Sequence, residues 1–260
     1  MSKLLTRRPN GYRRLGIGMA VAFLMVVATG SGRAGILADG ALGDDHGLLG
    51  FIQIAPSADE SASYEGLLAA SARGDVAAIR ALAAAGADLN QRDSHGRTPL
   101  MVAAYGRHYD AIAVLIALGA DSDALDNQRY DVITIAGVID DVETVRLMIS
   151  AGANPGLITS PYQGTALIAS AHLGRVAVVR ELIAAGAPLD HVNNLGWTAL
   201  IEAIVLGDGG PAHTAIVRDL VAAGADVNLA DRSGVSPLAL ALGRGYMAMV
   251  EALRAAGAQP

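Results

Sequence analysis

Six histidines and a pair of adjacent carboxylates in the middle of this 260-residue chain are the first candidates for catalysis or metal binding. Histidine titrates near neutral pH and binds metals, and paired carboxylates can share acid–base work. The histidines are His46, His95, His108, His172, His191 and His213, and the carboxylates are Asp140 and Asp141. Their spacing forms no His-Glu-x-x-His zinc motif, and no Gly-x-Ser-x-Gly nucleophile is present. The sequence therefore predicts no catalytic residue and no metal site.

Composition excludes further classes of chemistry. The chain has no cysteine, which rules out disulfides, thiolate metal sites and a cysteine nucleophile. Its glycine-rich stretch at 207–210 is not followed by the lysine of a nucleotide-binding loop, and no cofactor is predicted. Residues 35–260 hold 13 basic and 25 acidic residues, which argues against nucleic acid as a partner.

A tripeptide that recurs along the chain indicates which elements must position these side chains. It reads Ala-Gly-Ala or Leu-Gly-Ala, and it returns at a nearly constant interval that is longest before its fifth occurrence. Its glycines are Gly86, Gly119, Gly152, Gly186, Gly224 and Gly257. A fixed period of about 33 residues predicts a repeat architecture, in which each unit buries its apolar face against its neighbours.

A second marker follows most of these glycines by twelve or thirteen positions. It reads Thr98-Pro99-Leu100 at first, and later Thr-Ala-Leu at 165–167 and 198–200 and Ser-Pro-Leu at 236–238. Its hydroxyl suits a helix N-cap, and Asp131 can play the same part in the third repeat. Gly74, Gly174 and Gly207 suit left-handed ends of the first helices. Arg107 and Asp140 stand where that glycine is missing, so strained turns are expected there.

Together these markers resemble the ankyrin repeat family. The second repeat matches its pattern at Asp93, Gly96, Thr98, Pro99, Leu100, Ala103, Ala104, His108, Leu115, Gly119, Ala120 and Asp121. The resemblance covers residues 62–260 and implies an all-α solenoid of about six repeats, each a helix-turn-helix followed by a β-hairpin loop. The expected repeats are 62–92, 93–125, 126–157, 158–192, 193–230 and 231–260. In this family His108 would be a structural histidine beside the helical turn.

The segment 1–34 has the layout of a bacterial export signal. A basic stretch ends at Arg14, a largely apolar stretch follows, and small residues come after it. The pair Arg13-Arg14 lacks the preceding Ser or Thr of a twin-arginine signal, so the general secretion route is favoured. The sequence predicts cleavage, a periplasmic location and no membrane span in the mature form; an uncleaved anchor is the alternative. Residues 35–61 are predicted to be a flexible linker.

The resemblance also implies where a partner would bind. Ankyrin proteins generally use the concave face, meaning the exposed ends of the first helices, together with the hairpin tips. The corresponding concave residues are Tyr105, Val138, Ile139, His172, Leu173, Val205 and Leu206. The tip residues are Arg92, Asn127, Gln128, Tyr162, Asn194 and Arg232. Apolar anchors with a polar rim suit protein recognition.

The fifth repeat carries an insertion of about five residues, with Asp208, Gly209, Gly210 and His213 in the loop between its helices. This loop is either a recognition loop whose Gly N–H groups hold an anion or a tolerated surface insertion. The sequence as a whole predicts a monomeric, non-catalytic adaptor or regulator that binds a protein of unknown identity. The alternatives are a membrane-tethered ankyrin protein and an enzyme built on the repeats.

Overall fold

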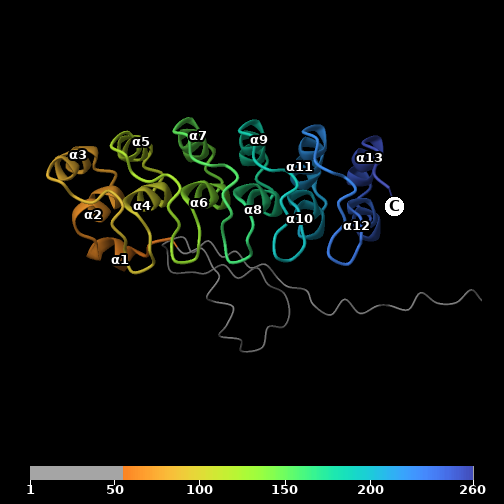
Figure 1. Cartoon of the computed structure of the whole chain (residues 1–260), viewed down its shortest axis with the longest axis horizontal. Coiled ribbons are helices and arrows are strands. Elements are labelled where there is room, and N and C mark those ends of the chain that lie inside the picture. Colours follow the sequence, from red (N-terminus) through yellow and green to blue (C-terminus); the bar gives the residue numbers. More distant parts are fainter. Residues whose placement is uncertain (1–54, 260) are drawn as a thin grey trace, which may run out of the picture.

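The structure, a computed structural model, describes residues 55–259. Two rows of helices stack side by side, and loops shaped like hairpins project beyond one row (Figure 1). The predicted export signal at 1–34 and the predicted linker up to residue 54 lie outside the described residues. The expected all-α ankyrin stack of about six repeats is confirmed.

The row beside the hairpins contains the first helix of each repeat. Its members are α2 (Gly66–Ala72), α4 (Pro99–Tyr105), α6 (Val132–Val138), α8 (Ala166–His172), α10 (Ala199–Val205) and α12 (Pro237–Arg244). The second row contains α3 (Val76–Ala84), α5 (Tyr109–Ala117), α7 (Val142–Ser150), α9 (Val176–Ala184), α11 (Pro211–Ala222) and α13 (Met247–Ala255). Each helix packs against its own repeat and the next one, and one apolar core runs through the stack.

The predicted caps begin the first helices. The side chains of Thr98, Thr165, Thr198 and Ser236 each accept a hydrogen bond from the backbone N–H three residues later. The Asp131 side chain likewise accepts from the N–H of Thr134 at 2.9 Å. Burial raises the pKa of Asp131 to about 6, although the hydrogen bonds from Thr134 oppose the rise. The third repeat therefore keeps its cap by burying a carboxyl group.

The turns between the two helices of a repeat confirm one expectation and correct another. Arg107 and Asp140 have φ of 54° and 57°, the left-handed conformation that glycine adopts at Gly74 and Gly174. Gly207 does not have a positive φ, contrary to the prediction, because the insertion lengthens its turn and moves that conformation to Gly209. Glycine is required at 207 for a different reason: a Cβ there would collide with the carbonyl oxygen of Ala203.

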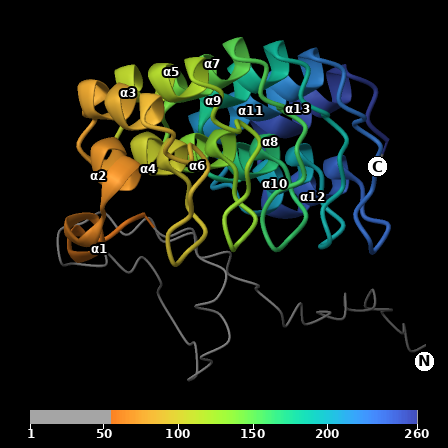
Figure 2. The same ribbon diagram turned by 60° about the vertical axis from the view of Figure 1, so that its left-hand side comes forward.

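The hairpin-shaped loops form an array beside the first row, and they follow one another along the stack (Figure 2). Backbone bonds join neighbours: the N–H of Asn127 donates to the carbonyl of His95, and the N–H of Asn194 donates to that of Tyr162. Between residues 55 and 259 the only β-type pairing is an isolated bridge between Thr159 and Gly164, so no continuous strand forms.

A short helix, α1 (Ala58–Ser63), occupies a region that the sequence assigned to the flexible linker. Ser57 and Glu60 form a reciprocal capping box that begins it, with Ser57 Oγ accepting from the Glu60 N–H at 3.1 Å. The helix lies beside α2 and the first hairpin (Figure 1). The linker was predicted from its composition, and the Ser-x-x-Glu spacing at 57–60, which is typical of a helix start, was not used.

Candidate functional site

The predicted concave residues lie at the ends of four first helices, and most of their side chains are only partly exposed to solvent. Tyr105, Ile139, Leu173 and Leu206 are partly buried, as is Val205. None of them is among the large apolar side chains that are well exposed. The predicted apolar residues therefore lie at the expected helix ends, but they expose less surface to a partner than the sequence suggested.

Val138 is a correction within that set. Its side chain is fully buried, as is every residue of α6, because this helix is packed between α4 and α8. Val138 therefore belongs to the core and has no surface for a partner. Tyr105, at the equivalent place on α4, is partly buried, and its hydroxyl forms no hydrogen bond within residues 55–259. Burial raises the pKa of this phenol well above its usual range.

Four of the six predicted tip residues connect one hairpin to the next. Arg92 donates to the carbonyl of Leu125 at 2.6 Å, and the Asn127 amide donates to that of Ser94 at 3.1 Å. The Asn194 amide donates to Pro161, and Arg232 donates to Asn194. These side chains thus hold the hairpins in line, and they reach a partner only where their atoms remain exposed. Gln128 and Tyr162 are partly buried.

The best-exposed apolar residues near the tips were not predicted. Ile158 is 44% exposed and Val192 is 45% exposed. Each comes directly before the residue whose N–H closes its hairpin, Thr159 to Gly164 in one repeat and Asn193 to Trp197 in the next. They therefore occupy the same position on adjacent hairpins. Counting back from the hairpin-closing residue would have found them from the sequence.

We call this equivalent position on four successive hairpins the hairpin row. Its members are Leu125, Ile158, Val192 and Ala230, and each precedes the hairpin-closing residue of its repeat. Leu125 and Ala230 are partly buried, so the row is most exposed at its centre. Ile158 and Val192 thus expose aliphatic side chains at equivalent positions on adjacent hairpins.

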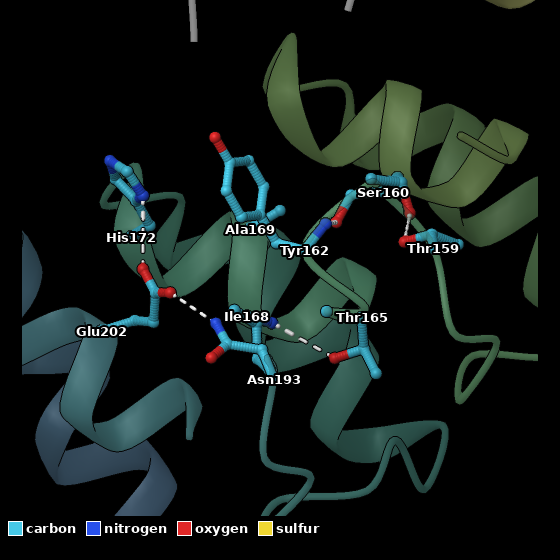
Figure 3. Close-up of a pocket in the computed structure, with 11 residues that line it drawn as sticks. Thr159, Ser160, Tyr162, Thr165, Ile168, Ala169, His172, Asn193 and Glu202 are labelled. Carbon is cyan, nitrogen blue, oxygen red and sulfur yellow. Dashed lines mark hydrogen bonds and ion pairs between the residues drawn. The ribbon is translucent and has the colours of Figure 1, made fainter. Parts of the chain in front are cut away.

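A small pocket lies behind the hairpins of the fourth and fifth repeats (Figure 3). It has a volume of about 20 Å³. Its walls are formed by Thr134, Thr159, Ser160, Tyr162, Gly164, Thr165, Ile168, Ala169, His172, Asn193 and Glu202. Of these, only Tyr162 and His172 are not buried, so the mouth of the pocket lies between them.

Glu202 is the charged residue of this pocket, and its side chain is only 1% exposed. Its Oε1 accepts a hydrogen bond from the Asn193 amide at 2.8 Å. Asn193 is fixed in that orientation, because its Oδ1 accepts from the N–H groups of Leu195 and Trp197, both at 3.0 Å. The other oxygen, Oε2, lies 3.3 Å from His172 Nδ1 and forms no hydrogen bond within the described chain.

The insertion in the fifth repeat adds chiefly to a helix. Pro211 and His213 lie in the first turn of α11, which has 12 residues where the other second helices have nine. Asp208 accepts hydrogen bonds from the Gly210 N–H and from His213 Nδ1, both at 2.8 Å, and these lower its pKa. The Gly210 N–H that the sequence offered to an external anion therefore bonds to the chain's own carboxylate. His213 Nε2 lies 2.9 Å from the carbonyl oxygen of His172 and joins the fourth and fifth repeats.

A buried ionic cluster at the first hairpin was also missed by the sequence. Arg97 is 1% exposed, and its guanidinium bonds to Asp93 at 2.6 Å and to Glu60 of α1 at 2.9 Å. Tyr64 donates to Asp93 at 2.6 Å. Burial alone would raise the pKa values of Asp93 and Glu60, but hydrogen bonds and the charge of Arg97 outweigh it and lower both. The cluster fastens α1 to the first hairpin.

Two features that would suggest other functions are absent from the described residues. In the part of the chain from residue 55 to residue 259, no three His, Asp or Glu side chains come together as ligands for a metal ion. Over the same residues, no helix is both long and apolar enough to cross a membrane. His95 and His191 lie on different hairpins, where His95 contacts Glu60 and His191 bonds to the carbonyl of Gln163.

Comparison with known proteins agrees with this geometry. The family model for ankyrin repeats (3 copies) matches residues 50–129 and 133–231. The putative ankyrin repeat protein YahD of Escherichia coli strain K12 is 34% identical over 192 residues, which are 74% of this chain and 95% of YahD. An ankyrin repeat domain from Acinetobacter baumannii AYE has a solved structure with 42% identity and a TM-score of 0.71, covering 74% of this chain and 98% of that one.

Two more distant solved structures share the architecture. The ankyrin repeat domain of Bcl-3, a member of the IkappaB family, is 26% identical with a TM-score of 0.67, and the match covers 76% of this chain and 88% of that one. A chain in the structure of a predatory endopeptidase from Bdellovibrio bacteriovorus in complex with an immunity protein is 26% identical, with a TM-score of 0.62. That match covers 74% of this chain and 98% of the other.

Proposed function

This chain belongs to the ankyrin repeat family, and from that premise we propose that it is a non-catalytic adaptor or regulator that binds a protein partner. Ankyrin repeat domains typically act as protein–protein interaction modules. The endopeptidase–immunity protein complex from Bdellovibrio bacteriovorus contains a chain with this fold, which supports a protein as the ligand. The binding residues proposed here are those of the hairpin row and the neighbouring first-helix ends.

The observation that carries the proposal is the pair of exposed aliphatic side chains at the centre of the hairpin row. Ile158 and Val192 are each more than 40% exposed on adjacent hairpins. Leu173 and Leu206 add partly buried apolar surface at the ends of α8 and α10. Fully burying an exposed aliphatic side chain contributes about 1.5–3 kcal/mol, so covering the exposed part of Ile158 and Val192 would contribute about 1 kcal/mol each, which makes the pair candidate anchors.

The test is affinity capture with the full chain, tagged at its C-terminus and produced in its own cell. The variant Ile158→Ser/Val192→Ser should lose a captured protein that the wild type retains, with at least tenfold weaker binding of the purified partner. Met247→Ser is the matched control, because Met247 is 54% exposed on α13 and lies outside the row. Equal capture by the wild type and the double variant would contradict the proposed surface, provided that circular dichroism shows both to be folded.

The location in the periplasm is part of the same proposal. It rests on the basic, apolar and small-residue order of residues 1–34. The mass of the chain purified from the cell envelope would decide it. Cleavage after Gly30 or Ala34 is expected, whereas an intact N-terminus would favour the alternative, an ankyrin protein tethered to the membrane by its first segment.

A further inference from the structure

We propose that the pocket beside Glu202 binds a primary ammonium group, supplied by a lysine side chain of the protein partner. This inference rests on the proposed function and specifies the chemistry of the partner. It follows from four properties of the pocket: an incompletely bonded buried carboxylate, a volume that fits one small polar group, hydroxyl oxygens in its walls, and two rings at its mouth (Figure 3).

The carboxylate of Glu202 is the first property. A buried charge is costly unless other groups compensate it. Asn193 is neutral and serves only Oε1, whereas Oε2 accepts no hydrogen bond within residues 55–259. His172, 3.3 Å away, supplies a positive charge only when it is protonated. A lysine ammonium carries that charge permanently at neutral pH, so it would compensate Glu202 where a neutral imidazole does not.

The size of the pocket selects among cations. A volume of about 20 Å³ holds one group of the size of a water molecule. An ammonium is a compact point charge with three donors, whereas a guanidinium is a wider planar group with five donors. The pocket therefore fits a lysine head group or a single water, and it is too small for arginine.

Two hydroxyl oxygens also line the pocket. Thr165 Oγ1 accepts from the Ile168 N–H at 3.4 Å, and Ser160 Oγ accepts from the Tyr162 N–H at 3.3 Å. A hydroxyl oxygen has two lone pairs, so each of these atoms can accept a second bond. Both lie away from Glu202 (Figure 3), so the carboxylate is the partner that we assign to the ammonium.

The mouth suits the stem of the same side chain. His172 and Tyr162 project to the same side of α8, with Ala169 between them (Figure 3). The methyl group of Ala169 leaves space that a larger residue would fill, and aromatic faces attract an ammonium and its alkyl stem. The acidic excess of residues 35–260, 25 acidic against 13 basic, further favours a partner that presents lysines.

The test uses n-butylammonium, which reproduces the end of a lysine side chain, added to the isotope-labelled full chain and followed by NMR. We expect saturable shifts at Thr165, Ala169 and His172 with a millimolar dissociation constant. n-Butanol, with the same alkyl chain and no charge, should give no saturable shift. Glu202→Gln should weaken binding at least tenfold, since it removes the charge and retains the acceptor for Asn193.

Two more variants keep the test decisive. Ala169→Leu should block the pocket without touching the carboxylate, and it serves if Glu202→Gln does not fold. Glu143→Gln removes an exposed carboxylate on α7 and should leave the dissociation constant unchanged. Equal binding by the wild type and Glu202→Gln, the same response to n-butanol, or a pocket that holds only a water would overturn the proposal.

The outcome is separable from that of the capture experiment. Partner capture that depends on Ile158 and Val192 and is unchanged in Glu202→Gln would leave the adaptor function in place and overturn the lysine assignment. Binding of n-butylammonium without capture of any protein would overturn both the adaptor function and the assignment of the ammonium to a protein lysine.

Discussion

Asp131 shows how a single cap residue makes the stability of the stack depend on pH. Its pKa is about 6 in the folded chain, against an ordinary value of 3.8, because the carboxyl is buried at the start of α6. Between about pH 4 and pH 6 the folded state therefore keeps a proton that the unfolded state has released. The contribution of Asp131 to the free energy of unfolding falls as the pH rises through this window.

The variant Asp131→Thr should remove that dependence while keeping the cap. Relative to the wild type, it should gain about 2 kcal/mol of stability on going from pH 4.5 to pH 7.5. Urea unfolding of both proteins at the two pH values measures the difference. Asp75→Thr, which alters the partly exposed cap of α3, is the matched control and should show no such gain. A constant offset between wild type and Asp131→Thr would contradict the prediction.

At this scale the sequence predicted residue types better than residue environments. The caps at Thr98, Thr165, Thr198 and Ser236, and the left-handed turns at Arg107 and Asp140, follow from local chemistry and are confirmed. The prediction that Val138 contacts a partner was wrong, and the exposure of Ile158 was not predicted. Both depend on how neighbouring repeats cover a side chain, which the spacing of residues within one repeat does not specify.

At the scale of elements, α1 owes its place to one buried arginine. Arg97 lies between Asp93, which is on the same hairpin, and Glu60 of α1, and the Arg97 and Asp93 side chains are 1% and 4% exposed. Removing one partner of a buried ion pair leaves the other charge uncompensated, which typically costs about 3–5 kcal/mol. The pairing of Arg97 with Glu60 depends on tertiary contact between distant positions of the chain, so the sequence offered no local signal for it.

Arg97→Met should therefore release α1 and destabilise the first two repeats by about 3 kcal/mol. Hydrogen exchange would report it as faster exchange at residues 58–105, with little change in α11 and α13. Arg146→Met is the control, because Arg146 pairs with Glu181 on the exposed surface and such pairs contribute about 0–1 kcal/mol. Unchanged exchange in α1 would show that apolar contacts with α2 hold the helix in place without the cluster.

For the whole molecule, the spacing of about 33 residues predicted a repeat architecture. The resemblance of the caps and glycines to the ankyrin pattern implied the stack of helix pairs that the structure has. Different residue types form the same polar contact between neighbouring repeats. In four repeats a side chain places a polar group within hydrogen-bonding distance of a carbonyl oxygen at or just beyond the end of the preceding first helix; these residues are His108, Arg175, His213 and Tyr246. Only His108 was predicted as structural, because the other repeats have a different residue from the histidine of the ankyrin pattern or have it displaced by the insertion.

The longer α11 also bears on how the molecule would behave under mechanical load. The stretch of chain from Gly186 to Gly224 is longer than any other between consecutive members of the recurring glycines. A fully extended chain spans about 3.3–3.6 Å per residue, so an insertion of about five residues adds about 17 Å of contour length. If the stack were pulled apart from its ends one repeat at a time, one extension step would be longer than the rest, and it would mark the position of the insertion along the array.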